Sequence, residues 1–198
     1  MTTPPDSSTR QRLIEATLEI IDSHGVGAVR VHDVVERANT TTGSLYWFFK
    51  NRKELINAAL AEQFASQMRP VVELVRTTMS HAEVTIDMLF DQRFDFATKD
   101  RVVARRQRID VLSAALSDSD LAAEVARIQQ ELLQIAVDVI TDAQQRGLAR
   151  DDVDPYSFAQ FIQAMTIGFA VADLSKDMLP DHENWWKINR LFVEMLKK

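Results

Sequence analysis

The sequence predicts an all-α fold of about nine helices, divided into a small N-terminal part (residues 10–50) and a larger part (residues 51–198). Apolar side chains recur at helical spacing along most of the chain, and no segment of usable length alternates with the two-residue period of a strand. Five glycines and five prolines are few for 198 residues, which disfavours a loop-rich all-β fold. Residues 1–9 are polar and are expected to form a disordered lead-in.

Composition excludes several classes of protein. There is no cysteine, so disulfides, thiolate zinc sites and cysteine nucleophiles are excluded. The four histidines are scattered, and neither a metal-ligand pair, a glycine-rich phosphate loop nor a nucleophile elbow is present. We therefore expect no enzyme activity, no cofactor and no metal site. No apolar run approaches the roughly 20 residues that span a bilayer, and the N-terminus lacks a signal peptide's apolar core, so we expect a cytoplasmic protein without a membrane partner.

The net charge of −6 is unevenly distributed. Residues 10–56 carry seven Lys or Arg against six Asp or Glu, a net charge of +1, which leaves −7 for the rest of the chain. A nucleic-acid partner for the N-terminal part is therefore compatible with the acidic total.

The N-terminal part begins with two predicted helices. An apolar stripe marks a helix over residues 10–24, and Gly25 suits the position after its end. Residues 25–28 are expected to form a turn. A short amphipathic helix follows over residues 31–38, and Asn39 after it tolerates a left-handed turn conformation.

Capping residues predict the next two helices. Thr41 or Thr42 can N-cap a short helix that runs through Phe49. Asn51, with Glu54 three residues later, is typical of a capping box and predicts a long helix over residues 51–78. Pro70 is expected to kink or end that helix, because proline removes a backbone hydrogen bond and crowds the preceding turn. Apolar periodicity and polar breaks predict further helices over residues 80–99, 100–116, 121–146, 155–176 and 180–198.

Two short helices joined by a tight turn, with a supporting helix before them, are the arrangement of a helix-turn-helix DNA reader. Such a unit places the amino end of its second helix against base edges in the major groove. That end must be thin and polar, which Thr41, Thr42, Gly43 and Ser44 satisfy.

The aromatic run that follows divides by helical geometry. Phe48 and Phe49 are expected to cover the small core together with Leu45. A short helix in so small a unit has one face that it cannot bury, so Tyr46 and Trp47 are predicted to face DNA. Three cations, Lys50, Arg52 and Lys53, come next and are expected to neutralise phosphates.

Residues 10–56, about a quarter of the chain, resemble the DNA-binding domain of the tetracycline-repressor (TetR) family of bacterial transcriptional regulators. The resemblance is carried by residues 14–25, by Asp33-Val34-Val35 with Ala38, and by the run TTGSLYWFFKNRKEL. It implies an all-helical homodimer that binds a palindromic operator as a repressor and is released by a small molecule bound in the larger domain. Activation in place of repression stays open.

The resemblance implies DNA contacts on a defined set of residues: Arg30, His32, Thr41, Thr42, Gly43, Ser44, Tyr46, Trp47, Lys50 and Arg52. Four positions depart from the family. Asn39 stands where members often have Gly, and Thr40 where they often have a buried Val. Val31 stands where members usually have a Thr or Ser cap, and Phe48 where they often have His or Tyr.

The last two predicted helices carry aromatic and aliphatic faces that an isolated subunit would partly expose. With the resemblance, these faces predict a four-helix dimer interface; the alternative is an internal helical pair. The interface residues are expected to be Phe158, Phe161, Ile162, Gly168, Trp185, Ile188, Leu191, Phe192 and Met195.

An effector cavity is expected among the middle helices, with adaptable walls of Met and Phe and a largely apolar ligand. The candidate lining residues, each of which could equally be plain core, are Phe64, Met68, Met88, Leu89, Phe94, Arg105, Ile109, Leu112, Met165 and Phe169.

Two charged stripes have more than one interpretation. Asp87, Asp91 and Asp95 form an acidic stripe at four-residue spacing, and Arg101, Arg105 and Arg108 form a basic one on the next helix. The simpler interpretation is two solvated faces with weak pairing. The sharper hypothesis is an arginine that meets an anionic effector, such as a carboxylate.

The main rival function is a helical carrier or adaptor that binds a small molecule without touching DNA. It leaves the exposed aromatic pair and the nearby cations unexplained. A ligand-responsive regulator of transcription accounts for both.

Overall fold

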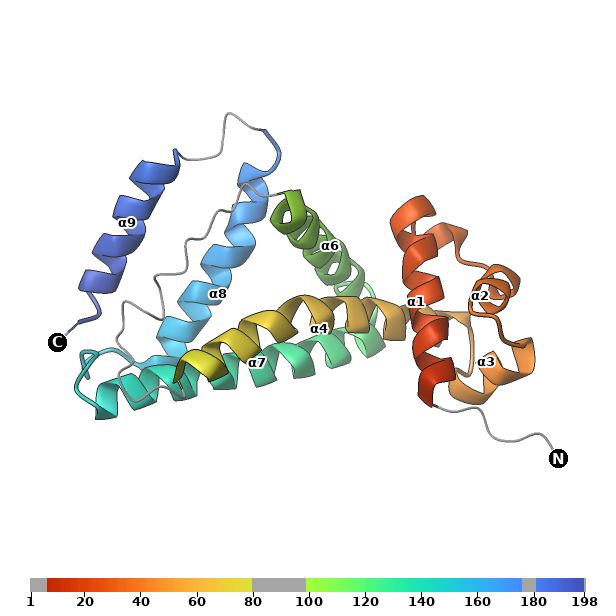
Figure 1. The fold of residues 1–198 in the computed structure, drawn as a ribbon, viewed down its shortest axis with the longest axis horizontal. Helices are drawn as coiled ribbons and strands as arrows, with labels where there is room; N and C mark the ends of the chain where they lie inside the picture. The colour runs from red at the N-terminus through yellow and green to blue at the C-terminus, as the bar shows by residue number, and fades with distance from the viewer. Residues whose placement is uncertain (1–6, 80–98, 176–180, 198) are drawn as a thin grey trace. The chain divides into compact units, whose positions relative to one another are not determined.

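Figure 1 shows the computed structural model of the chain, which describes residues 7–79, 99–175 and 181–197. Among these residues the predicted all-α class is confirmed, and the one β-type pairing is an isolated antiparallel bridge between Ala149 and Lys197. None of the helices in the described ranges is long and apolar enough to cross a membrane. The elements are α1 (Ser7–His24), η1 (Val26–Ala28), α2 (Val31–Arg37), α3 (Thr42–Phe48), α4 (Arg52–Met79), α6 (Lys99–Ala115), α7 (Ser119–Gln145), α8 (Pro155–Ala172) and α9 (His182–Glu194).

The chain divides into two compact units. The first contains Met1–Ser66 and Ser113–Val125, and the second contains Gln67–Leu112 and Ala126–Lys198. The first unit therefore includes the amino half of α4 in addition to the predicted 10–50 domain.

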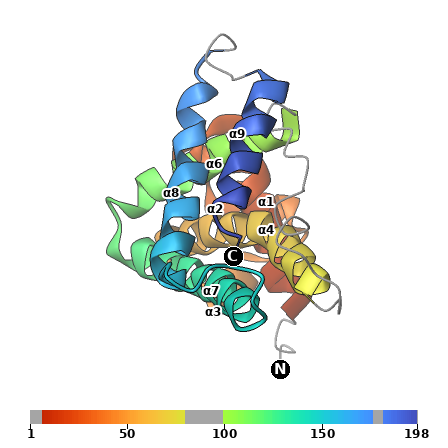
Figure 2. The same cartoon turned by 90° about the vertical axis from the view of Figure 1, so that its left-hand side faces the viewer.

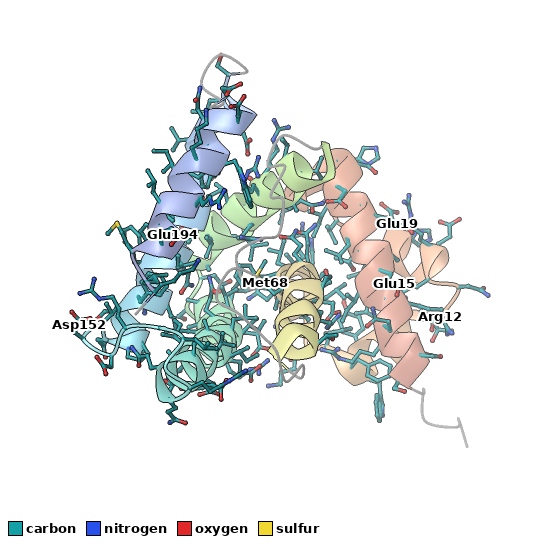
Figure 3. All side chains as sticks on the ribbon, turned by 60° about the vertical axis from the view of Figure 1, so that its left-hand side comes forward. Arg12, Glu15, Glu19, Met68, Asp152 and Glu194 are labelled. Carbon is teal, nitrogen blue, oxygen red and sulfur yellow. The ribbon has the colours of Figure 1, made fainter. Side chains whose placement is uncertain are left out.

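The core of the first unit is built on α1, which packs against η1, α2 and α3. The apolar stripe predicted for α1 is buried, with Leu13 and Ile14 among its members, and Leu45 and Phe49 meet it from α3 and its end. Burying large apolar side chains at 3.6-residue spacing fixes which face of each helix turns inward. Arg12, Glu15 and Glu19 lie along α1 in Figure 3.

The helix ends of the first unit follow the predicted capping chemistry. Gly25 closes α1 with a φ of 79°, which glycine adopts without strain. Residues 26–28 form a 3-10 turn rather than an irregular one. Glu54 N donates to Asn51 Oδ1 at 2.9 Å, so Asn51 caps α4 as predicted. Glu54 Oε2 accepts from Lys50 N at 2.7 Å, one residue before the N-cap N–H that a capping box uses. The helix then continues through Pro70 to Met79, so Pro70 does not end it.

The second unit is anchored where α7, α8 and the C-terminus meet. Asp154 caps α8 by accepting from Ser157 N at 2.7 Å, and Pro155 occupies the first turn, as predicted. A buried cluster of Ala143, Ala149, Phe158 and Leu196 joins the three segments. Helices α8 and α9 lie side by side (Figure 2), with the Phe158 and Phe192 rings stacked at 5.7 Å.

Some boundaries differ from the sequence-based prediction. Helix α8 ends at Ala172, four residues before the predicted Lys176, because Asp173 caps it with its N–H bonded to Val171 O. Helix α7 begins at Ser119, two residues earlier than predicted, because Asp118 Oδ1 accepts from the backbone N of Asp120 and Leu121. The helix predicted over residues 80–99 lies, apart from Lys99, outside the described residues, as do Asp87, Asp91 and Asp95.

Candidate functional site

The turn between α2 and α3 is fixed by two backbone hydrogen bonds. Thr40 N donates to Val35 O at 2.9 Å and Asn39 N donates to Glu36 O at 3.1 Å, the pair of bonds that defines a Schellman motif. Asn39 has a φ of 47°, the left-handed conformation predicted for it. The turn is therefore rigid, and it sets the direction in which α3 starts.

The amino end of α3 is polar and exposed. Thr41 is the N-cap, since its Oγ1 accepts from Ser44 N at 3.1 Å, which decides between the two candidate caps. Thr42 and Gly43 are exposed. A Cβ added to Gly43 would meet only Thr41 Oγ1, at an ordinary 3.7 Å, so the packing of the chain itself does not require glycine there.

The aromatic run separates into core and surface as predicted, with one refinement. Tyr46 and Trp47 are 52% and 61% exposed, whereas Phe49 is 2% exposed and lies under the Arg10 guanidinium at 5.4 Å. Phe48 is half-buried rather than part of the core, and its ring meets Trp47 edge-to-face at 4.6 Å. Helix α3 thus presents two large aromatic side chains beside its hydroxyl-bearing end.

The three cations after α3 have different environments. In the described part of the chain the Lys50 ammonium has no carboxylate partner, and it is exposed. Arg52 instead donates from Nε to Val29 O at 2.7 Å and from Nη2 to Val26 O at 3.0 Å, which holds the η1 turn against the start of α4. Lys53 Nζ lies 3.1 Å from Asp118 Oδ2. The sequence predicted phosphate contacts for all three and did not predict the internal bonds of Arg52 and Lys53, which join residues 23 to 65 positions apart.

Arg30 and His32 flank the start of α2. Arg30 Nη1 donates to Gly27 O at 3.0 Å. The exposed His32 ring has its Nδ1 3.6 Å from Asp33 Oδ1. Helix α2 has no side-chain cap at Arg30, in agreement with the missing Thr or Ser at Val31. Contacts of both residues with DNA stay predictions.

A polar cluster in the first unit joins the start of α4 to the turn before α7. Asp118 accepts from Asn57 Nδ2 at 3.1 Å as well as pairing with Lys53. The hydrogen bond from Asn57, with those from Lys53 and two backbone N–H groups, lowers the pKa of Asp118 to about 2. Asp118 is therefore ionised at neutral pH and fixes the amino end of α4 to this turn.

The predicted effector residues are not brought into one place by the described structure. Phe64 is buried in the first unit, whereas Met68 on α4 (Figure 3), Leu112, Met165 and Phe169 are half-buried in the second. Ile109 is 38% exposed. Phe169 packs edge-to-face on Trp185 at 4.7 Å. Met88, Leu89 and Phe94 lie outside the described residues.

Arg105 does not belong to a solvated basic face. Its Nε and Nη2 donate to Asp173 Oδ2 and Oδ1 at 2.6 and 2.5 Å, and both side chains are 11% exposed. This two-pronged pairing joins α6 to the end of α8 within the second unit. The sequence did not predict Asp173; its one signal was an isolated acid after the apolar α8 run.

The predicted interface residues form both an internal pair and an exposed surface. Phe158 is buried and Phe161 stacks on Phe192 at 5.5 Å, so α8 and α9 pack on each other. The two helices also carry apolar side chains that are exposed to solvent: Phe161, Ile188, Leu191 and Met195 are 48%, 57%, 61% and 65% exposed. Gly168 is exposed and a Cβ there would meet nothing within 4 Å, so the described residues make no close helix approach at Gly168.

The N-terminal part matches a known family. Residues 13–59 match the family described as bacterial regulatory proteins, tetR family. Over 55 residues the chain is 38% identical to the probable acrEF/envCD operon repressor of Escherichia coli (strain K12); the match covers 28% of this chain and 25% of that protein. The chain thus spans about a quarter of the length of the curated relatives it matches.

Solved structures share the fold over the whole chain. A protein from Rhodococcus sp. assigned to the TetR family of transcriptional regulators aligns with a TM-score of 0.71 and 22% identity, covering 98% of this chain and 100% of that one. A transcriptional regulator from Saccharomonospora viridis, solved in complex with choline, aligns with a TM-score of 0.70 and 18% identity, with the same coverage. At these identities the likeness establishes the fold.

Proposed function

We propose that the chain is a cytoplasmic transcriptional regulator of the family described as bacterial regulatory proteins, tetR family, which its residues 13–59 match. In this proposal it binds a palindromic operator as a homodimer, represses transcription from it, and is released by a small-molecule effector. The observation that carries the proposal is the amino end of α3, where exposed hydroxyls adjoin Tyr46 and Trp47 on a rigidly packed three-helix unit.

The proposed contacts follow from the exposure of these side chains. An amino helix end with N-cap hydroxyls can enter the major groove, where Thr and Ser bond to bases or phosphates. The Tyr46 phenol can donate to a phosphate and the Trp47 indole can pack on thymine methyls. The Lys50 ammonium, unpaired in the described part of the chain, supplies a phosphate contact. Arg52 acts chiefly by holding the η1 turn.

Two copies are proposed to join through the exposed apolar faces of α8 and α9. Exposed side chains as large as Ile188, Leu191 and Met195 on one face are characteristic of protein–protein contact. A two-fold dimer would present two reading ends to half-sites about 34 Å apart. Replacing Leu191 with Asp is expected to give a monomer by sedimentation and to abolish binding to the palindrome; a dimer that survives this change would place the interface elsewhere.

Release is proposed to be a population shift. Helix α4 begins beside the reading end and continues from the first unit into the second, and Asp118 fixes its first turns. A ligand that prefers one tilt of α4 lowers operator affinity by its differential affinity for the two states. Going from mostly bound to mostly free requires about 5 kcal/mol of such preference. The choline complex of a structural neighbour supports a ligand of small-molecule size.

Operator selection tests the proposal. Random duplexes are enriched on the wild-type protein, and binding of the selected duplex is followed by fluorescence anisotropy as salt is raised. We expect a palindromic site, and an affinity that falls steeply with salt because bound phosphates release counterions. A protein that enriches no duplex, yet binds small molecules, would be the carrier or adaptor instead.

A further inference from the structure

The second unit contains a buried arginine atom that has no hydrogen-bond partner among the described residues. Arg108 on α6 is half-buried, its Nε is shielded from solvent, and this atom has no hydrogen-bond partner among the described residues. Burial, together with the nearby Arg105 charge, lowers the pKa of Arg108. A buried N–H donor without an acceptor is unfavourable, so the unpaired Nε of Arg108 calls for an explanation.

Arg105, one turn earlier on α6, is an arginine of the same unit whose side chain is hydrogen-bonded. Its Nε and Nη2 both donate to the Asp173 carboxylate. That carboxylate is therefore occupied by Arg105, and no described group accepts a hydrogen bond from Arg108 Nε. These two arginines of α6 therefore differ: Arg105 is bonded to Asp173, whereas Arg108 Nε has no acceptor among the described residues.

A second unsatisfied atom lies on the helix that contacts α6. Gln67 on α4 donates from Nε2 to Gln107 Oε1 at 3.0 Å, which brings α4 against α6 next to Arg108 in the sequence. Gln67 Oε1 is buried and has no partner in the described part of the chain. Of all described residues, these two side chains alone have a buried polar atom left unpaired. Arg108 Nε requires an acceptor, and Gln67 Oε1 requires a donor.

We propose that Arg108 binds the oxyanion of the effector, a carboxylate or a phosphate, and that Gln67 accepts a hydrogen bond from a donor on the same ligand. This rests on the proposed function, since it assigns a chemical class to the effector of that regulator. The planar guanidinium matches either oxyanion with parallel N–H donors. Met68, which follows Gln67 on α4 and is half-buried, favours an apolar remainder.

The test compares Arg108→Met with Arg106→Met, an exposed arginine on the same helix, in thermal unfolding. Without ligand, Arg108→Met is expected to melt no lower than wild type, because it removes an unpaired buried charge. Decanoate, decyl phosphate and neutral decanol are then added as probes. One of the two anions is expected to raise the Tm of wild type and of Arg106→Met by about 2–4 °C more than decanol does. This difference should vanish in Arg108→Met, and should shrink in Gln67→Met if the probe carries a hydroxyl, as 3-hydroxydecanoate does.

Decanoate and decyl phosphate distinguish a carboxylate effector from a phosphate effector. A carboxylate of the chain itself is a third possible partner of Arg108. If Arg108→Met melts lower than wild type, and this loss disappears in a background of Asp87→Asn, Asp91→Asn and Asp95→Asn, Arg108 pairs with its own chain and the proposal is overturned. It is also overturned if no anion exceeds decanol, or if the anion effect persists in Arg108→Met.

A parallel measurement distinguishes this inference from the proposed function. Anisotropy with the selected duplex, without any probe, is expected to give the same affinity for wild type and Arg108→Met. If wild type binds duplex DNA and the anion results are negative, only the oxyanion site fails. If wild type enriches no duplex, the regulator assignment fails, whatever the anions do.

Discussion

The two units of the molecule leave different kinds of groups unsatisfied. In the first unit, the buried polar side-chain atoms of the described residues have partners, and Tyr46, Trp47 and Lys50 are exposed. In the second unit, the unpaired groups are the buried Arg108 Nε and Gln67 Oε1. A surface that awaits a large, hydrated partner can keep its groups in water until binding. A site for a small molecule must leave them buried, at a cost in stability that the ligand removes.

The largest expected effects separate core from reading surface within α3. Leu45→Ala should lower the free energy of unfolding by about 2–5 kcal/mol, because Leu45 is fully buried. Tyr46→Ala with Trp47→Ala should leave stability nearly unchanged and weaken operator binding about a hundredfold, since each base or backbone contact is worth about 1–3 kcal/mol. Urea unfolding and anisotropy check the two quantities. Equal loss of stability in both variants would mean that the aromatic pair is core.

Next in size is the contrast between two neighbouring cations. Arg52→Gln should cost about 1–3 kcal/mol of stability, because it removes charged hydrogen bonds to Val29 O and Val26 O. Lys50→Gln should cost almost none, but should reduce the slope of log affinity against log salt by about 1. If Arg52→Gln changed the salt slope as much as Lys50→Gln, Arg52 would be a phosphate contact rather than a support of the η1 turn.

A smaller effect is expected at Gly43. Gly43→Ala has room within the chain, so the Tm should stay close to that of wild type. Operator affinity should fall about tenfold, as one obstructed backbone approach costs about 1.4 kcal/mol. Gly27→Ala, which also has open space around it, serves as the matched control. An unchanged affinity for Gly43→Ala would show that the backbone at Gly43 does not approach DNA closely.

The smallest effect concerns the Asp118 cluster. The pKa of Asp118 is lowered to about 2, so its stabilising contribution is present above its unfolded value near 4 and is lost as pH falls toward 2. Asp118→Asn should therefore be less stable than wild type at pH 7, and the difference should shrink between about pH 4 and pH 2. Asp120→Asn, at an exposed position 3.7 Å from Lys53, is the control and should show little of this dependence. A difference independent of pH would argue against an ionised Asp118.

The contrast between the units also explains what the sequence could predict. The left-handed Asn39 and the N-cap at Asn51 depend on residues within a few positions, so local rules were sufficient. The same rules left the cap of α3 open between Thr41 and Thr42, and the hydrogen bond from Ser44 N decides for Thr41. The burial of Phe49 and the exposure of Trp47 followed from helical periodicity. The sequence alone could therefore predict which side chains of α3 face the core and which face solvent.

The remaining features depend on distant residues. Arg52 meets Val29, Asp118 meets Asn57, and Arg105 meets Asp173 across 23, 61 and 68 positions, which no local pattern encodes. The charged stripe on α6 was visible in the sequence, but its interpretation as a solvated face was wrong for Arg105 because the folded chain buries it against Asp173. The end of α8 at Ala172 was missed because no glycine or proline follows it before Pro180.

The most direct test of the central claim uses Trp47 as its own reporter. The chain has three tryptophans, so Trp185→Phe with Trp186→Phe leaves Trp47 as the one emitter. Acrylamide quenching of that emission is measured with and without the selected duplex. Trp47 is 61% exposed in the free protein, and we predict that DNA binding reduces its quenching severalfold. Saturating binding of the duplex with quenching of Trp47 unchanged would contradict the claim that the amino end of α3 lies in the groove.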